Sequence, residues 1–114
     1  MHEIYLVKNI IQILEEEFSS GDLDQLRAID LKVGELSNAE PQLMQNAFKA
    51  LTETSKKYQS VKLNIEMIPI SIYCQDCNSY TIIDNYRFIC TCGRSNNNVV
   101  QGMELTIHRL HFDE

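Results

Sequence analysis

The chain has 114 residues, of which 44% are hydrophobic and 23% are charged, a balance typical of one compact globular domain rather than of a disordered or fibrous chain. Its 16 Asp and Glu exceed its 10 Lys and Arg, and the resulting formal net charge of −6 disfavours nucleic acid as a partner. The sequence shows neither the pattern of a secretory signal nor a run of about 20 apolar residues, so we expect a cytoplasmic protein with no membrane partner.

The first predicted helix covers residues 4–18, because apolar residues recur there at spacings of three and four. The Ser-Ser-Gly-Asp run at 19–22 is expected to break this helix. Apolar and polar residues then alternate over 27–33, which predicts a half-buried strand. The residues expected on its buried face are Ile29, Leu31 and Val33.

A second amphipathic helix is predicted over about 41–54, after a turn at 34–38. Two interpretations of its start are open. Ser37 and Glu40 fit a capping box, whereas Pro41 prefers the first helical position and disfavours a helical residue before it.

Two more alternating segments, 61–67 and 103–108, predict the remaining strands. The stretch between them differs in composition, because it holds all four cysteines and few apolar residues at regular spacing. The predicted fold class is α+β: a three-stranded sheet covered by two helices, with an inserted zinc-ribbon lobe. The predicted domains are residues 1–68 plus 102–114, and a lobe of residues 69–101.

The cysteines form two close pairs, Cys74-Gln-Asp-Cys77 and Cys90-Thr-Cys92. Thiols stay reduced in the cytosol, so these pairs favour a four-thiolate Zn(II) site, with the metal serving as the core of the lobe. The Cys-x-Cys spacing of the second pair requires a bend, which Gly93 allows. Other sites remain open at this point: an iron–sulfur cluster, a redox Cys-x-x-Cys, or zinc with His108 or His111 in place of Cys92.

The first three residues, Met-His-Glu, precede the first helix directly. The imidazole of His2 lies within chelate reach of the Met1 α-amine and of nearby backbone nitrogens. A planar set of nitrogen donors suits Ni(II) or Cu(II). The alternative is that His2 is simply a solvated residue.

Four segments together resemble the HypA family of nickel metallochaperones, and they occur in the order of that family from one end of the chain to the other. They are the opening Met-His-Glu, the turn Val33-Gly34-Glu35-Leu36-Ser37, the paired cysteines, and the closing Gly102-Met103-Glu104-Leu105. One departure is clear, because the family usually repeats Cys-x-x-Cys where this chain has Cys-x-Cys.

The resemblance implies a protein that binds nickel and delivers it to [NiFe]-hydrogenase during maturation, and in some bacteria to urease. It implies as partners a HypB-type GTPase, the hydrogenase large-subunit precursor and urease maturation proteins. The implied nickel site consists of His2, the Met1 amine and the backbone nitrogen of Glu3, with Glu40 as a nearby acidic residue. The implied zinc ligands are Cys74, Cys77, Cys90 and Cys92.

Two other classes of function compete with nickel delivery. A zinc-ribbon module for protein interaction would explain the cysteines and leave the N-terminal His-Glu pair incidental. An enzyme is disfavoured, because the sequence shows no nucleophile with a base at a readable spacing and no phosphate-binding loop. We therefore expect a protein without catalytic residues.

Overall fold

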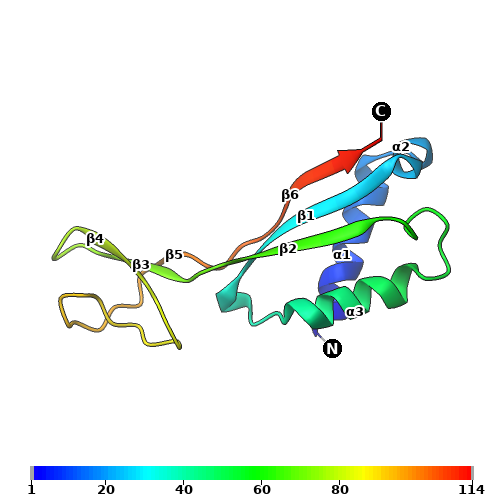
Figure 1. Cartoon of the computed structure of the whole chain (residues 1–114). Coiled ribbons are helices and arrows are strands. Elements are labelled where there is room, and N and C mark those ends of the chain that lie inside the picture. The colour runs from blue at the N-terminus through cyan, green and yellow to red at the C-terminus, as the bar shows by residue number, and fades with distance from the viewer. Residues whose placement is uncertain (1, 114) are drawn as a thin grey trace. The chain divides into compact units, whose positions relative to one another are not determined.

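The structure, a computed structural model, describes residues 2–113 (Figure 1). It contains two three-stranded sheets, with strand orders β2-β1-β6 and β4-β3-β5. This arrangement confirms the predicted α+β fold. The elements in chain order are α1 (His2–Glu17), α2 (Ser20–Asp24), β1 (Leu26–Gly34), the short 3-10 helix η1 (Glu35–Ser37), α3 (Pro41–Thr52), β2 (Lys62–Ile68), β3 (Ser71–Cys74), β4 (Ser79–Ile82), β5 (Val99–Gln101) and β6 (Leu105–Phe112).

The described residues form two compact units. The smaller one, here called the cysteine lobe, contains β3, β4 and β5, and the larger one is the α/β unit. Residues 32–38, at the end of β1 and in η1, cluster with the cysteine lobe, although the sequence interpretation places them in the other domain. The domain boundaries proposed from the sequence stay a prediction. The lobe comprises 32–38 and 67–105, and the α/β unit comprises 2–31, 39–66 and 106–113.

Helices α1 and α3 pack against each other and cover one face of the β2-β1-β6 sheet (Figure 1). The buried side of α1 is the apolar stripe expected from its periodicity, whereas Tyr5 is 64% exposed on the helix surface. The alternation predicted for β1 is also observed. The buried residues are Val7, Ile10 and Leu14 of α1, and Ile29, Leu31 and Val33 of β1.

The break expected at residues 19–22 is confirmed, because α1 ends at Glu17, but a second short helix that the sequence did not predict begins there. The Ser19 hydroxyl accepts a hydrogen bond from the backbone N–H of Asp22 at 3.1 Å, and the Asp22 carboxylate accepts from the N–H of Ser19 at 3.4 Å. This reciprocal capping box starts α2, and the buried Leu23 attaches it to the core. The polar run therefore ends one helix and begins the next.

The start of α3 is resolved in favour of Pro41 as its first residue. Glu40 is the N-cap, and its side chain accepts a hydrogen bond from the N–H of Gln42 at 3.0 Å. Ser37 instead donates its hydroxyl hydrogen to the carbonyl oxygen of Gly34, at 2.7 Å. The helix ends at Thr52, two residues before the predicted end.

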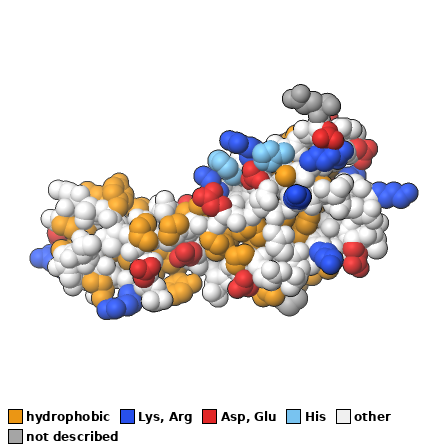
Figure 2. Space-filling model, viewed as in Figure 1, with side chains coloured by type: hydrophobic (Ala, Val, Ile, Leu, Met, Phe, Trp, Pro, Cys, Tyr) orange, Lys and Arg blue, Asp and Glu red, His pale blue; other side chains and the backbone are white. Residues whose placement is uncertain are grey.

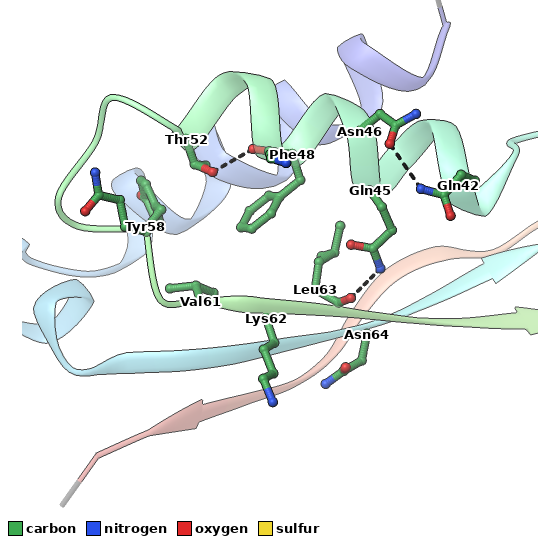
Figure 3. Close-up of a pocket in the computed structure, with 12 residues that line it drawn as sticks. Gln42, Gln45, Asn46, Phe48, Thr52, Tyr58, Val61, Lys62, Leu63 and Asn64 are labelled. Carbon is green, nitrogen blue, oxygen red and sulfur yellow. Dashed lines mark hydrogen bonds between the residues drawn. The ribbon is translucent and has the colours of Figure 1, made fainter.

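Strands β1 and β2 run in the same direction, as their arrows show in Figure 3, and α3 connects them. A parallel pair needs such a crossover connection, which the 27 residues between the two strands supply. β6 runs the opposite way on the other side of β1. Because β1 is the central strand in the order β2-β1-β6, β2 is an edge strand of this sheet.

The cysteine lobe has its own apolar core, and the expectation that a metal alone would serve as its core is wrong. Two cysteines lie within this core, side by side with branched aliphatic residues. The apolar residues come from a strand and from irregular segments, so they show no periodicity along the sequence. The buried members are Ile70, Ile72, Cys74, Ile83 and Cys90, with Phe88 and Val99 packed against them.

Several apolar side chains of the lobe remain at its surface, and Figure 2 shows hydrophobic patches, in orange, on this part of the molecule. Tyr80 and Ile82 project from β4 and are 71% and 55% exposed. Tyr80 also packs against Tyr73 of the paired strand β3, with ring centroids 4.9 Å apart. The lobe is thus only partly closed around its core.

Two glycines allow the backbone to approach itself closely within the lobe. A Cβ atom added to Gly34 would lie 2.0 Å from the carbonyl oxygen of Gly102. That oxygen accepts a hydrogen bond from the N–H of Leu36 at 2.9 Å, and Gly102 has a φ of 109°, which favours glycine. Both glycines belong to segments that carry the family resemblance, so a backbone contact explains each of them.

Candidate metal centres

All four cysteines meet in the lobe. Their sulfur atoms all lie within 4.8 Å of one another, and the Sγ atoms of Cys77 and Cys90 are 3.3 Å apart. Cys74 and Cys90 are buried, whereas Cys77 and Cys92 are exposed. The cluster therefore lies where the core of the lobe meets its surface.

The first pair is held by the hairpin between β3 and β4. Cys74 is the last residue of β3, and Cys77 lies in the turn that follows. Asn78 has a φ of 51°, a left-handed conformation that asparagine tolerates, and it turns the chain back into β4. The hydroxyl of Ser79 lies 3.0 Å from the Cys77 sulfur. The turn thus directs both sulfurs of the pair to one place.

The second pair reaches the cluster despite its shorter spacing. The N–H of Gly93 donates to the carbonyl oxygen of Cys90 at 2.8 Å. The N–H of Cys90 donates to the carbonyl oxygen of Arg94 at 2.9 Å. Gly93 has a φ of 92°, so the bend that the Cys-x-Cys spacing requires falls on this glycine. The exposed salt bridge between Arg94 and Asp76, at 2.7 Å, joins the two turns.

The thiols affect one another's ionisation. The backbone N–H of Cys92 and the Cys77 thiol lower the pKa of Cys90 to about 6. The Ser79 hydroxyl acts to lower the pKa of Cys77, but the neighbouring Cys90 and Cys74 thiols raise it to about 11. One thiolate therefore forms readily and opposes the ionisation of the others, so four thiolates in this space require a cation.

The arrangement fits Zn(II). Tetrahedral coordination with Zn–S bonds of about 2.3 Å places the sulfurs about 3.8 Å apart, close to the spacing of this cluster. Four thiolates fill the coordination sphere and leave no open position for a substrate. The donor set therefore suits a structural ion held by Cys74, Cys77, Cys90 and Cys92.

The other candidate site lies at the start of α1. His2 is the first described residue, is helical and is exposed, while Met1, whose amine is part of the predicted nickel site, lies outside the described residues. The first four N–H groups of a helix have no partner within the helix, so the backbone nitrogens of His2 and Glu3 are not needed for the helix's own hydrogen bonds.

Glu3 links the start of α1 to the start of α3. Its carboxylate accepts a hydrogen bond from the backbone N–H of Glu40 at 3.1 Å. This bond, with smaller contributions from its own N–H and from His2, lowers the pKa of Glu3. The Glu40 side chain is itself engaged as the N-cap of α3. The structure thus brings the backbone of Glu40 to Glu3, and a role for Glu40 at the nickel site stays a prediction.

The two other histidines do not join the cysteines. His111 lies in β6 with its Nε2 2.7 Å from a carboxylate oxygen of Asp30, and the other oxygen of that carboxylate accepts from Asn64 at 2.9 Å. His108 is exposed on the same strand. Over residues 2–113, the four cysteines are the only group of three or more His, Cys, Asp or Glu placed to hold a metal ion.

Sequence reasoning missed two parts of these sites. It used only the backbone of Glu3, although the side chain makes the contact with Glu40, 37 residues away. It also omitted the Asn-Ser pair after Cys77, which forms the turn and approaches the sulfur. Asparagine directly after a Cys-x-x-Cys pair is a local signal for a left-handed turn, whereas no local signal indicates the Glu3 contact.

Comparison with known proteins gives concordant matches over nearly the whole chain. A family model described as "Hydrogenase/urease nickel incorporation, metallochaperone, hypA" matches residues 1–112. A hydrogenase maturation factor HypA from Lawsonia intracellularis is 35% identical over 119 residues, covering 99% of this chain and 100% of that protein. The HypA of Campylobacter jejuni is 31% identical over 111 residues, covering 96% and 97%.

Solved structures agree with the fold. The solution structure of the Ni metallochaperone HypA from Helicobacter pylori matches with a TM-score of 0.66 and 24% identity, over 98% of this chain and 97% of that one. A second solution structure of a HypA protein matches with a TM-score of 0.68 at the same identity. In the chain described here, no helix among residues 2–113 has the length and apolar character needed to cross a membrane.

Proposed function

Because the chain belongs to the HypA family of hydrogenase and urease nickel-incorporation metallochaperones, we propose that it binds Ni(II) at its N-terminus and delivers the ion to a hydrogenase precursor during maturation. The observation that carries this proposal is the placement of His2. Its imidazole is exposed at the first turn of α1, and the next residue fixes that turn to α3.

The proposed nickel ligands are the His2 imidazole, the Met1 amine, and the backbone nitrogens of His2 and Glu3. A cation is disfavoured at a helix N-terminus, which carries a partial positive charge. Coordination by deprotonated backbone nitrogens removes this penalty, because each of them supplies a negative charge. Such a planar nitrogen set suits Ni(II) and Cu(II), so the choice between the two ions depends partly on the proteins that exchange them.

The contact between Glu3 and Glu40 supports this site in a second way. The Glu3 carboxylate adds negative charge beside His2, and its bond to the N–H of Glu40 holds the segment in place. The ion remains at the surface, with the His2 imidazole as its only side-chain ligand. Protonation of the imidazole then competes with nickel, and a partner can reach the ion without unfolding the domain.

We propose that the four-cysteine cluster holds one resident Zn(II). This ion supplies the positive charge that four close thiolates need and ties the β3–β4 hairpin to the second cysteine turn. Its proposed role is to order the lobe, and nickel transfer takes place at the other site. No bond in a substrate is made or broken, so the protein acts as a carrier rather than as an enzyme.

The proposed partners are a HypB-type GTPase and the hydrogenase large-subunit precursor, with urease maturation proteins as a second client group. The family's role in hydrogenase and urease nickel incorporation supports hydrogenase-related partners in general. The proposed site of action is the cytoplasm. Neither nucleic acid nor a membrane is part of this proposal.

The test is elemental analysis and nickel titration of protein with its native, untagged N-terminus, because any residue placed before Met1 removes the free amine. We expect one zinc per chain and one nickel whose binding is lost in His2→Ala. His108→Ala is the matched control, since it removes an exposed imidazole from β6 and should leave nickel binding unchanged. Zinc with unaltered nickel binding in His2→Ala would contradict the N-terminal site and favour a zinc-ribbon interaction module.

A further inference from the structure

A groove of about 520 Å³ runs between α3 and β2 within the α/β unit (Figure 3). One wall is the exposed side of α3 and the other is the first half of β2. Side-chain amides are frequent along it, and Phe48 and Leu63 lie at its base. The amide-bearing residues are Gln42, Gln45, Asn46, Gln59 and Asn64.

The β2 wall of the groove is an open strand edge. The side chain of Gln45 donates a hydrogen bond to the carbonyl oxygen of Leu63, so this oxygen points away from β1 and towards the groove. Backbone groups alternate in direction along a strand. The N–H and C=O of Ile65, two residues further on, therefore point to the same open side, as they would for pairing with another strand.

The residues that line the groove include two lysines and no carboxylate, although the chain is negative overall. Residues 42–64 contain four lysines and one glutamate, a formal charge of +3, whereas the whole chain carries −6. Lys49 and Lys62 line the groove, and both are exposed. Figure 3 shows Lys62 pointing to the side of β2 opposite α3. A strand added at this edge would thus meet a lysine of the helix wall on one face and Lys62 on the other.

Two carboxylates outside the groove bond to residues that line it. Asp30 accepts a hydrogen bond from Asn64 at 2.9 Å. Glu15 accepts a hydrogen bond from the hydroxyl of Tyr58 at 3.2 Å. Burial, together with the charge of Glu15, raises the pKa of Tyr58 to about 12. The Tyr58 hydroxyl therefore keeps its proton near neutral pH and continues to donate to Glu15. Neither Lys49 nor Lys62 forms a salt bridge among residues 2–113.

We propose that this groove binds an extended, acidic segment of a partner protein, which pairs with β2 as an added strand. Main-chain hydrogen bonds to Leu63 and Ile65 would supply affinity, and Lys49 and Lys62 would select acidic residues on the two opposite faces of the added strand. Gln45 occupies the acceptor on Leu63 in the free protein and gives it up to the incoming strand. The proposal does not depend on nickel binding, so the failure of one leaves the other standing.

Lysines at a strand edge also serve to prevent association between edges. The two roles differ in what they predict. A merely protective edge repels other strands whatever their charge, whereas a binding edge takes an acidic strand and rejects a basic one. The experiment therefore compares peptides of opposite charge.

The experiment uses the full zinc-loaded chain, labelled with ¹⁵N, and three capped peptides of equal length. The first repeats two valines followed by two aspartates, which places aspartates on both faces of a strand. The second has lysine in place of each aspartate, and the third is the acidic peptide with alternate backbone nitrogens methylated. We expect only the first to bind. Its chemical-shift changes should lie in β2 and on the exposed side of α3, and the amide hydrogens of Leu63 and Ile65 should exchange about tenfold more slowly.

Charge-reversal variants identify the lysines involved. Lys49→Glu and Lys62→Glu should each weaken binding of the acidic peptide by about tenfold. Lys8→Glu makes the same change in net charge on α1, outside the groove, and should have no such effect. Gln45→Ala frees the Leu63 acceptor and should strengthen binding by about threefold.

Four results would overturn the proposal: equal binding of the acidic and basic peptides, retained binding of the methylated peptide, shift changes confined to another surface, or no binding at all. A concentration-dependent slowing of exchange in β2 without peptide would also overturn it, because a second copy of the chain would then be the occupant of the edge.

Discussion

The two candidate metal sites differ in how the chain supplies their ligands. In the cysteine lobe, four side chains from two separated turns meet in one cluster, and two of them are part of the apolar core. At the N-terminus, the proposed nickel site combines one exposed imidazole with backbone nitrogens of the same few residues. The first site depends on the fold of its unit, whereas the second depends mainly on local chain geometry.

In the proposed function, this difference separates a resident metal from a transported one. When four thiolates enclose an ion, the free energy of binding the ion also stabilises the turns that hold it. Loss of the ion and loss of structure are therefore coupled. An ion at a chain end can leave without disturbing the core. The predictions below test whether stability and metal binding are linked in the lobe and independent in the α/β unit.

The largest effect is expected from Cys74→Ala. Structural zinc sites contribute roughly 10–16 kcal/mol of apparent binding free energy at neutral pH, so removing a buried ligand should abolish tight zinc binding and disorder the lobe. The amide signals of α1 and α3 should keep their positions, as measured by NMR with zinc quantified in parallel. Retention of a full zinc equivalent would show that Cys74 is not a ligand.

The second-largest effect is expected from Gly34→Ala, which introduces a clash with the backbone. In Gly34→Ala the new methyl group would lie 2.0 Å from the carbonyl oxygen of Gly102, and neither backbone segment can move without losing the hydrogen bond between Leu36 and Gly102. We expect a loss of about 2–4 kcal/mol in the free energy of unfolding.

The matched control for this clash is Gly21→Ala in α2. An added Cβ there meets only the Ser19 hydroxyl, at 3.9 Å. Because alanine is favoured over glycine in a helix, this variant should be stabilised by about 0.5–1 kcal/mol. Both values are measured by denaturant unfolding. Equal stability of the two variants would show that the approach of Gly34 to Gly102 is not tight in solution.

A smaller effect is expected from Glu40→Ala, which removes the N-cap of α3. The N–H of Gln42 loses its acceptor, and the cost should be about 1 kcal/mol. Glu40→Asp keeps a capping carboxylate and should recover most of the loss. The backbone N–H of residue 40 still donates to Glu3 in both variants. The free energy of nickel binding should therefore change less than the free energy of unfolding does. A complete loss of nickel binding in Glu40→Asp would instead assign its side chain to the metal.

The smallest effect concerns Asp30 on the β2-β1-β6 sheet. Hydrogen bonds from Asn64 and then from His111 lower the pKa of Asp30 below its ordinary value of 3.8. A carboxyl group with a lowered pKa in the folded state stabilises the fold above pH 3.8, and this contribution disappears as the pH falls through the folded-state pKa.

NMR titration of the Asp30 carboxyl carbon measures this pKa directly. Asn64→Ala should move the midpoint upward towards 3.8, with a small loss of stability near neutral pH. Zinc content should stay the same in this variant, since Asp30 lies in the α/β unit. An unchanged midpoint would show that the Asn64 contact is absent in solution.

The parts of the fold that sequence reasoning predicted are those with a short repeat. The apolar stripe of α1 and the alternation of β1 each follow from neighbours within a few residues, and the structure confirms both. The start of α3 stayed open, because two capping patterns overlap at Ser37, Glu40 and Pro41. Only the tertiary structure shows that Ser37 donates to Gly34 and that Glu40 is the cap.

The candidate sites divide in the same way. The spacing of the cysteine pairs and the His-Glu start were visible in the sequence, because chelation by near neighbours is a local property. The lobe's apolar core was not visible, since Ile83 and Phe88 join it from irregular segments without periodicity.

The sequence by itself determined the helical and strand periodicities, the two cysteine pairs and the resemblance to one family. Only the tertiary structure decided which distant groups meet: Glu3 with Glu40, Gly34 with Gly102, and Gln45 with the edge of β2. Local patterns depend on intrinsic backbone and side-chain preferences, which a short window contains. Contacts between distant residues depend on how the whole chain packs, and no single segment encodes that packing.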